Sequence, residues 1–280
     1  MKYSENIKEI RDRKPIFFQT WLPDKKLSGM IILIHGLGEH SGRYGSHFAD
    51  FYTSHNIGIK SFDLPGHGRS YGKKGHIDDP ILTFEIIDDL INETRLQFPD
   101  IPLFIYGHSF GGEIGLWYNI ARHPKVKGLI ITSPFIGPKD PVPAAKMFLA
   151  KTMDKLYPTF SMENGLRPED LSRDEKIVND YISDPLVHPM ITAKTGMVII
   201  NRGKWIMENA SDNDNETLLM VGECENIANP QPIFEFSKIA PHVTLQIWPG
   251  LFHEIHNEPE KETIYQFTLN WIREHNQNLK

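Results

Sequence analysis

Short apolar runs rich in β-branched residues alternate with longer stretches of helical periodicity, and this alternation constrains the fold more than any other feature of the chain. It predicts buried strands over residues 29–34, 58–62, 103–106, 128–132, 217–221 and 243–248. Helices are expected after most of these strands, for example over 83–97 and 263–275. The pattern is typical of an α/β fold with a mostly parallel central sheet and helices on both faces. Residues 7–22 are expected to form a leading antiparallel hairpin.

The alternation stops between residues 133 and 212, a stretch of about 80 residues that is too long for a simple connection. It opens with Pro134, Pro138, Pro141 and Pro143. We therefore expect a core made of residues 1–132 and 213–280 and an inserted helical cap over 133–212. Within the cap, one face of a predicted helix carries Ala145, Phe148, Leu149, Met153 and Leu156. This face either packs on its own domain or shelters an apolar substrate.

Charge and cysteine content exclude several classes of protein. The net charge is −6 and no dense block of Lys and Arg occurs, so a nucleic-acid partner is not expected. Cys224 is the single cysteine of the sequence, which rules out an intramolecular disulfide and a cysteine-type zinc site. Residues 1–14 lack the apolar segment of a signal peptide, and the longest apolar run, 30–34, is too short to span a bilayer. We expect a cytoplasmic protein.

A serine turn follows the predicted strand 103–106. Residues 107–112 read GHSFGG, and an amphipathic stretch follows at 113–122. This is a G-x-S-x-G sequence between a strand and a helix, the setting in which a serine hydroxyl is exposed on a sharp turn. The amides at the start of the helix favour developing negative charge. Ser109 is therefore the predicted nucleophile.

A second turn can supply an oxyanion hole. After the strand 29–34 the chain reads HGLG, which can direct the Leu37 N–H to the same point as the Phe110 N–H. A dinucleotide-binding fingerprint is the competing interpretation. It is disfavoured because Ser41 stands where the third glycine belongs and Gly42 comes one position late.

The base is predicted to be His253, because it follows the last buried strand at the sheet edge where ligands bind. The sequence HEIH at 253–256 is one residue too short for a zinc helix, so no metal is expected. The acid should come from the loop after strand 217–221, where Glu223 and Glu225 both qualify and we favour Glu225. Cys224 between them is expected to be a buried packing residue rather than a nucleophile.

With these features the chain resembles the monoacylglycerol lipase and lysophospholipase branch of the α/β-hydrolases over nearly its whole length. The matching segments are HGLGEHSGRY at 35–44, DLPGHGRS at 63–70, GHSFGG at 107–112, LSRD at 171–174 and YISDPL at 181–186. The resemblance implies that the cap is mobile over the active site. It also implies a catalytic triad of Ser109, His253 and the acid after the strand.

The resemblance has two departures. The family usually has aspartate in a Gly-x-x-Asp stretch where this chain has Glu225, and the longer side chain can lower activity unless the loop compensates. Phe110 stands where methionine is common, which should matter little because the role belongs to the backbone N–H.

The resemblance also implies a small polar pocket for glycerol, lined by Glu39, Arg43 and His256. For Glu39 and Arg43 a structural ion pair is the alternative. For His256 the alternative is an ordinary loop histidine.

We therefore predict a cofactor-independent serine carboxylic-ester hydrolase that acts on monoacylglycerols or similar single-chain lipid esters through an acyl-enzyme. A lysophospholipase or a short-chain carboxylesterase is the alternative within this class. A weakly active or non-catalytic binding module is the alternative outside it, because the triad aspartate is replaced. Related prolyl aminopeptidases share the serine turn, but no recognition site for a free amine is apparent. The expected partner is a small lipid ester, with transient contact of the cap with a membrane surface.

Overall fold

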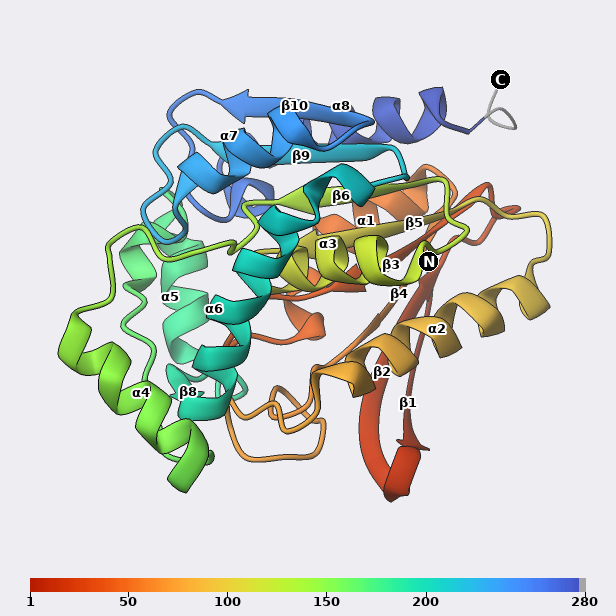
Figure 1. Ribbon diagram of the computed structural model, residues 1–280. Helices are drawn as coiled ribbons and strands as arrows, with labels where there is room; N and C mark the ends of the chain where they lie inside the picture. The colour runs from red at the N-terminus through yellow and green to blue at the C-terminus, as the bar shows by residue number, and fades with distance from the viewer. Residues whose placement is uncertain (277–280) are drawn as a thin grey trace.

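One eight-stranded sheet forms the centre of the molecule (Figure 1). The computed structural model describes residues 1–276, and for Arg13 only the backbone. The strand order is β1-β2-β4-β3-β5-β6-β9-β10. These strands are β1 (Lys2–Ile10), β2 (Lys14–Leu22), β3 (Gly29–Ile34), β4 (Ile57–Phe62), β5 (Leu103–His108), β6 (Gly128–Thr132), β9 (Thr217–Gly222) and β10 (Val243–Trp248).

The sheet is parallel from β4 to β10, and the hairpin β1–β2 joins β4 in antiparallel pairing. Strand β3 reads GMIILI and is buried along its whole length, as expected of a parallel strand that is covered on both faces. The hairpin begins at Lys2 rather than at residue 7. Strand β1 is mostly exposed and pairs through its backbone, so its side chains lack the apolar pattern that would mark it.

Helices cover both faces of the sheet, which confirms the predicted fold class. The helices are α1 (Phe48–Ser54), α2 (Pro80–Gln97), α3 (Phe110–Arg122), α4 (Ala144–Leu156), α5 (Glu175–Ser183), α6 (Ala193–Glu208), α7 (Pro230–Ile239) and α8 (Lys261–Glu274). One buried cluster joins the sheet to α2, α3, α6 and α7, and a second joins it to α1 and α8. Within residues 1–276 no helix has the length and apolar character needed to cross a membrane.

Residues 133–212, called the insertion below, lie between β6 and β9 and contain α4, α5 and α6. They also contain a two-stranded antiparallel sheet of β7 (Ser161–Glu163) and β8 (Met190–Thr192). Helix α6 packs against α3 of the core and against α4, which lies at the outer left edge of Figure 1. Short 3₁₀ helices complete the described chain: η1 (Arg11–Arg13), η2 (Ser41–Tyr44), η3 (Pro168–Asp170), η4 (Ala210–Asp212) and η5 (Ile255–Asn257).

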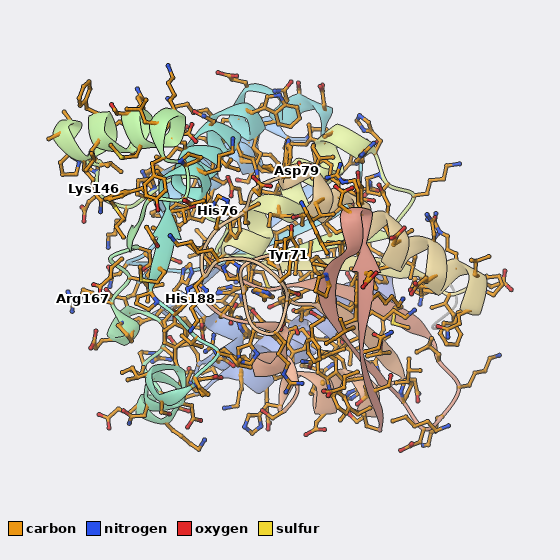
Figure 2. All side chains as sticks on the ribbon, turned by 90° about the horizontal axis from the view of Figure 1, so that it is seen from below. Tyr71, His76, Asp79, Lys146, Arg167 and His188 are labelled. Atoms are coloured by element: carbon orange, nitrogen blue, oxygen red, sulfur yellow. The ribbon has the colours of Figure 1, made fainter. Side chains whose placement is uncertain are left out.

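The insertion is hydrogen-bonded to loops of the core. The His188 N–H donates to the Gly38 carbonyl over 2.9 Å. His188 lies close to the loop that carries Tyr71 and His76, as the view from below shows (Figure 2). In the same region His76 Nδ1 lies 2.9 Å from Thr192 Oγ1, and the Thr192 N–H donates to the Gly75 carbonyl over 3.2 Å. Part of the insertion is therefore fixed to the core.

Helix α4 covers the predicted helical stretch, but its predicted apolar face does not pack as expected. Phe148 is 73% exposed and Leu156 is 75% exposed, and no residue of α4 is fully buried. The half-buried residues Met147 and Ala150 line a cavity instead. The prediction that Phe148 and Leu156 lie on the inward face is therefore wrong, although α4 does pack against α6 and borders the cavity. Spacing identifies residues that share a face, but the direction of that face depends on neighbours far along the chain.

Candidate active site

Ser109 lies on a sharp turn between β5 and α3. Its backbone has φ 53° and ψ −115°, a conformation that costs free energy for any residue with a side chain. The turn fits because its neighbours are glycines. A Cβ atom added at Gly107 would lie 2.5 Å from the Gly111 carbonyl oxygen, and one at Gly111 would collide with the Ile34 carbonyl. The glycines therefore permit the close packing that holds the serine at the carboxyl end of β5.

Two backbone amides are available beside Ser109. Phe110 begins α3, so its N–H has no partner within the helix. Leu37 lines the same cavity as Ser109 and Phe110, and its N–H donates to no group among residues 1–276. The turn is shaped by Glu39, whose Oε1 accepts from the Gly36 N–H over 2.6 Å. This arrangement can stabilise negative charge on a bound oxygen.

His253 and Glu225 form a buried pair. His253 Nδ1 lies 2.7 Å from Glu225 Oε2, and the two side chains are 2% and 0% exposed. Glu225 Oε1 accepts from the N–H groups of Ile227 and Ala228 over 2.7 and 3.0 Å. Burial alone would raise the pKa of Glu225, but His253 and these hydrogen bonds lower it. Burial alone would lower the pKa of His253, but Glu225 raises it.

Glu223, the other candidate acid, faces away from His253. It is exposed, and its Oε2 accepts from the Gly250 N–H over 3.0 Å. Cys224 is also exposed, so the expectation of a buried packing thiol is wrong. The reason is the tight turn after β9, which directs only Glu225 of these three side chains inward.

Ser109 and His253 come from neighbouring parts of the same sheet edge. The ring of His108, next to Ser109, lies 4.9 Å from the ring of His253. Ser133, which follows β6, donates to the His253 carbonyl over 2.8 Å. The hydrogen bonds of the described chain do not include one from Ser109 Oγ to His253 Nε2. Catalytic hydrogen bonds often tighten only when substrate binds, so this geometry is compatible with a nucleophile and base.

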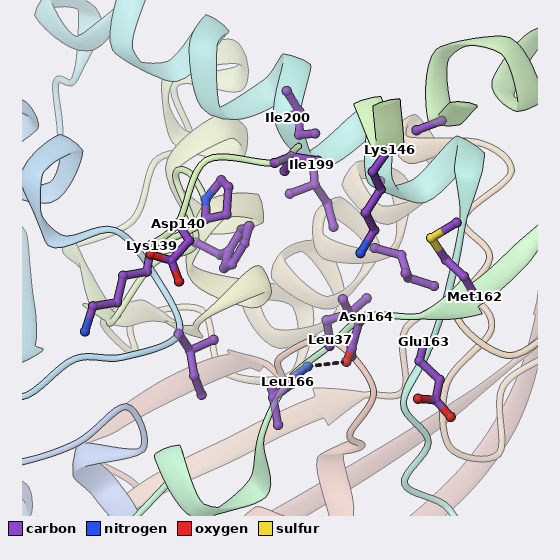
Figure 3. Close-up of a pocket in the computed structure, with 18 of the residues that line it drawn as sticks. Leu37, Lys139, Asp140, Lys146, Met162, Glu163, Asn164, Leu166, Ile199 and Ile200 are labelled. Atoms are coloured by element: carbon purple, nitrogen blue, oxygen red, sulfur yellow. Dashed lines mark hydrogen bonds between the residues drawn. The ribbon is translucent and has the colours of Figure 1, made fainter. Parts of the chain in front are cut away.

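A cavity of about 680 Å³ opens beside Ser109. Its apolar lining comes from both the core and the insertion: Leu37, Phe110, Phe135, Met147, Met162, Leu166, Ile191, Ile199 and Ile200. Charged residues also line it, among them Lys146, Glu163 and Arg167. Figure 3 shows Ile199 and Ile200 from α6 facing Leu37 and Leu166 across the cavity. A largely apolar cavity of this size suits a single hydrocarbon chain.

Glu39, Arg43 and His256 do not belong to the residues that line this cavity. Arg43 donates to Glu39 and forms two hydrogen bonds with Glu254, over 2.6 and 2.8 Å. His256 is buried, stacks on Tyr44, and has no hydrogen-bond partner for either ring nitrogen among residues 1–276. Burial lowers the pKa of His256 to about 4, so its ring is neutral. Substrate contact by these three residues stays a prediction.

Comparison with known proteins decides the family. The family described as serine aminopeptidase, S33 matches residues 25–260. A monoacylglycerol lipase from Mycolicibacterium smegmatis is 30% identical over 266 residues, which cover 93% of this chain and 93% of that protein. The chain belongs to the monoacylglycerol-lipase-like family of α/β-hydrolases. It is accordingly a hydrolase.

Further relatives place the chain in the same family. The crystal structure of a monoacylglycerol lipase from Paleococcus ferrophilus is 31% identical, with a TM-score of 0.83, and covers 93% of this chain and 99% of that one. An uncharacterized abhydrolase domain-containing protein from Dictyostelium discoideum is 36% identical over 276 residues, or 96% of this chain. This chain spans only 29% of the Dictyostelium protein.

In this member of the family, sequence reasoning missed Glu254. This buried carboxylate is the principal partner of Arg43. Its position directly after His253 is the signal that could have identified it. Within residues 1–276 no group of three or more His, Cys, Asp or Glu side chains could hold a metal ion.

Proposed function

We propose that the protein is a serine carboxylic-ester hydrolase that acts on monoacylglycerols or similar single-chain lipid esters. The observation that carries this proposal is the 2.7 Å hydrogen bond between His253 Nδ1 and Glu225 Oε2, formed beside the Ser109 turn. The apolar cavity that Ser109 lines supports a substrate with a hydrocarbon chain. Two relatives that carry the name monoacylglycerol lipase support the same substrate class.

The reaction begins when Ser109 Oγ attacks the ester carbonyl carbon and His253 Nε2 accepts the hydroxyl proton. The N–H groups of Leu37 and Phe110 stabilise the oxygen that becomes negative. The bond from carbon to the alcohol oxygen then breaks, and His253 returns the proton to the leaving alcohol. Water then attacks the acyl carbon and gives a proton to His253 Nε2. The bond from that carbon to Ser109 Oγ breaks, His253 returns the proton to Oγ, and the fatty acid leaves. Glu225 orients His253 and stabilises its protonated form.

A fluorophosphonate probe tests whether Ser109 is activated. We expect intact-protein mass and peptide mapping to show one label on Ser109, and no label in Ser109→Ala. Ser109→Ala and His253→Ala should each abolish ester hydrolysis, and the double variant should be no worse, because the two groups act as one unit. A double variant slower by the product of the two single effects would contradict this assignment.

The substrate class is tested with esters of graded chain length. Each buried CH₂ group contributes about 0.8 kcal/mol, so kcat/KM for monoacylglycerols should rise steeply until the cavity is full. The panel should include lysophospholipids and p-nitrophenyl acetate. A kcat/KM that is highest for acetate would indicate a short-chain carboxylesterase. A higher kcat/KM for lysophospholipids than for monoacylglycerols would indicate a lysophospholipase.

We also propose that the insertion acts as a cap and touches the lipid surface through α4. The exposed side chains of Phe148, Leu156 and Tyr157 lie near Lys151 and Lys155 in sequence, a combination of apolar and basic groups that suits an anionic membrane. Co-sedimentation with anionic vesicles should fall in the Phe148→Ser and Leu156→Ser double variant. Equal sedimentation of the variant and the parent protein would contradict the proposed membrane contact through α4.

A further inference from the structure

Three consecutive backbone amides hold the loop that carries His253. The Phe252 N–H donates to Glu258 Oε1 over 2.6 Å. The His253 N–H donates to the Asp170 carbonyl over 3.5 Å, and the Glu254 N–H donates to the Leu171 carbonyl over 2.7 Å. Two of these three acceptors belong to the insertion. The position of the catalytic histidine therefore depends on the insertion as well as on the sheet.

Glu258 joins the same two segments through its side chain. The carboxylate is fully buried. While Oε1 accepts from the loop at Phe252, Oε2 accepts from the Arg173 N–H over 3.0 Å and from Arg173 Nε over 3.2 Å. Ser172 Oγ lies 3.4 Å from the same oxygen and donates to the Asn257 carbonyl over 3.0 Å. Each carboxylate oxygen thus holds a different segment.

We infer that Glu258 is a positioning residue for His253: its carboxylate ties the Phe252 N–H to the insertion at Ser172 and Arg173. A buried carboxylate needs its hydrogen bonds and its positive partner, so the two segments are kept in one arrangement. The consequence for His253 is a fixed distance from Glu225. Among residues 1–276 the Glu258 carboxylate forms no hydrogen bond with Ser109, and Glu258 is not one of the residues that line the cavity.

The inference rests on the proposed role of His253 as general base. A misplacement of about 1 Å in a catalytic group can cost about a hundredfold in rate. We therefore expect loss of Glu258 to lower kcat by about 10- to 100-fold for a short ester, with little change in KM. Short esters are the suitable substrates because they do not depend on the chain-binding part of the cavity.

Three variants test the inference. Glu258→Ala removes both links, and Glu258→Gln keeps the shape but places an amide group where one oxygen accepts from Arg173. Glu260→Ala is the matched control, because Glu260 also pairs with Arg173 but is exposed, and among residues 1–276 its carboxylate forms no hydrogen bond with residues 252–258. Thermal unfolding measures the folded fraction of each variant, and each rate is divided by the concentration of folded protein. If Glu258→Ala does not fold, the results for Glu258→Gln decide whether the inference holds.

Two readouts separate positioning from general stability. In the folded Glu258 variants the pKa of the acid limb of kcat/KM should move toward that of free imidazole, since the pairing with Glu225 is weakened. In ¹H NMR spectra recorded without substrate, the resonance of His253 Nδ1–H should lie further upfield in the Glu258 variants than in the parent protein. This resonance is identified by its loss in Glu225→Gln. Glu260→Ala should change neither. Folded Glu258 variants with an unaltered kcat, acid limb and resonance would overturn the inference, whereas an inactive parent protein would instead overturn the proposed function.

Discussion

The carboxylate of Glu225 is held by three hydrogen bonds, which restrict its long side chain to one position. A glutamate has one more rotatable bond than the aspartate that the family resemblance implies here. The N–H groups of Ile227 and Ala228 fix one carboxylate oxygen, and His253 binds the other. The loop therefore supplies the constraint that a shorter side chain would otherwise provide.

Removal of the negative charge at Glu225 should be costly. We expect Glu225→Gln to lower kcat by a factor on the order of 10³ to 10⁴, the scale of a lost orienting carboxylate. Glu223→Gln is the control, because Glu223 contacts Gly250 and not His253. Steady-state hydrolysis of a chromogenic ester measures both. The reverse ranking would assign the acid to Glu223.

The pairing of His253 with Glu225 also sets a pH dependence. In the proposed mechanism His253 must be neutral to accept the proton of Ser109, and Glu225 raises the pKa of His253 above its ordinary value. The rate constant kcat/KM should therefore rise with pH through a limb that lies above the ordinary histidine pKa. In Glu225→Gln the limb should move to lower pH, although the plateau is also lower. A limb at the same pH in both proteins would show that another group titrates.

At the level of single residues, sequence reasoning located the serine turn because its glycines are a local signal. It narrowed the acid to two residues, since a loop sequence does not show which side chains point inward. Glu258 was not identified, because its importance depends on Phe252 and Arg173 meeting through tertiary contacts.

At the scale of helices and strands, α4 shows which property the sequence does not predict. The six predicted parallel strands agree with the structure to within two residues, because such strands have short apolar sequences. Strand β10 was expected to be buried, but it is half-exposed because it lies at the edge of the sheet. The short strands β7 and β8 were not predicted. The helix itself was predicted, but its inward face was not. A helix beside a cavity has few buried contacts to distinguish its faces.

The inward face of α4 predicts which substitution affects chain-length preference. Met147 lines the cavity, whereas its neighbour Phe148 is exposed. Met147→Ser should flatten the rise of kcat/KM with acyl length and leave acetate hydrolysis unchanged. Phe148→Ser should preserve the rise when the substrate is monomeric. The measurement is kcat/KM of both variants for monoacylglycerols of increasing acyl length, each below its critical micelle concentration. A flattened profile in Phe148→Ser alone would mean that the opposite face of α4 binds the chain.

At the scale of the molecule, one buried pair connects the core to the insertion. Glu113 on α3 and Arg202 on α6 lie 3.8 Å apart, and both are almost completely buried. Both carboxylate oxygens of Glu113 and Nη1 of Arg202 have no hydrogen-bond partner among residues 1–276. Arg202 also lies over the ring of Trp117, 4.3 Å from its centre. The pair contributes little to the stability of the folded state, because both groups lose their hydration and gain no good hydrogen bond in return.

This pair predicts how stability changes with pH. Burial raises the pKa of Glu113 to about 8, from 4.5 in an unperturbed glutamate. Between these values the folded chain holds a proton that the unfolded chain releases, so this group's contribution to stability is lost as pH rises. Glu113→Gln should therefore show a smaller fall in Tm between about pH 5 and pH 8 than the parent protein. Exposed Glu235→Gln on α7 is the control. Parallel Tm curves for Glu113→Gln and the parent would contradict the prediction.

The hydrogen bonds between insertion and core have a consequence for building chimaeras. The Lys139 N–H donates to the Ile227 carbonyl, and Lys139 Nζ donates to the Glu225 carbonyl, so the insertion also contacts the loop that carries Glu225. Together with the contacts at Gly38 and at 252–258, it reaches three separate parts of the site. Residues 133–212 are therefore not a self-contained module. A graft from a relative should work best when the loops 225–229 and 252–258 are transplanted with it.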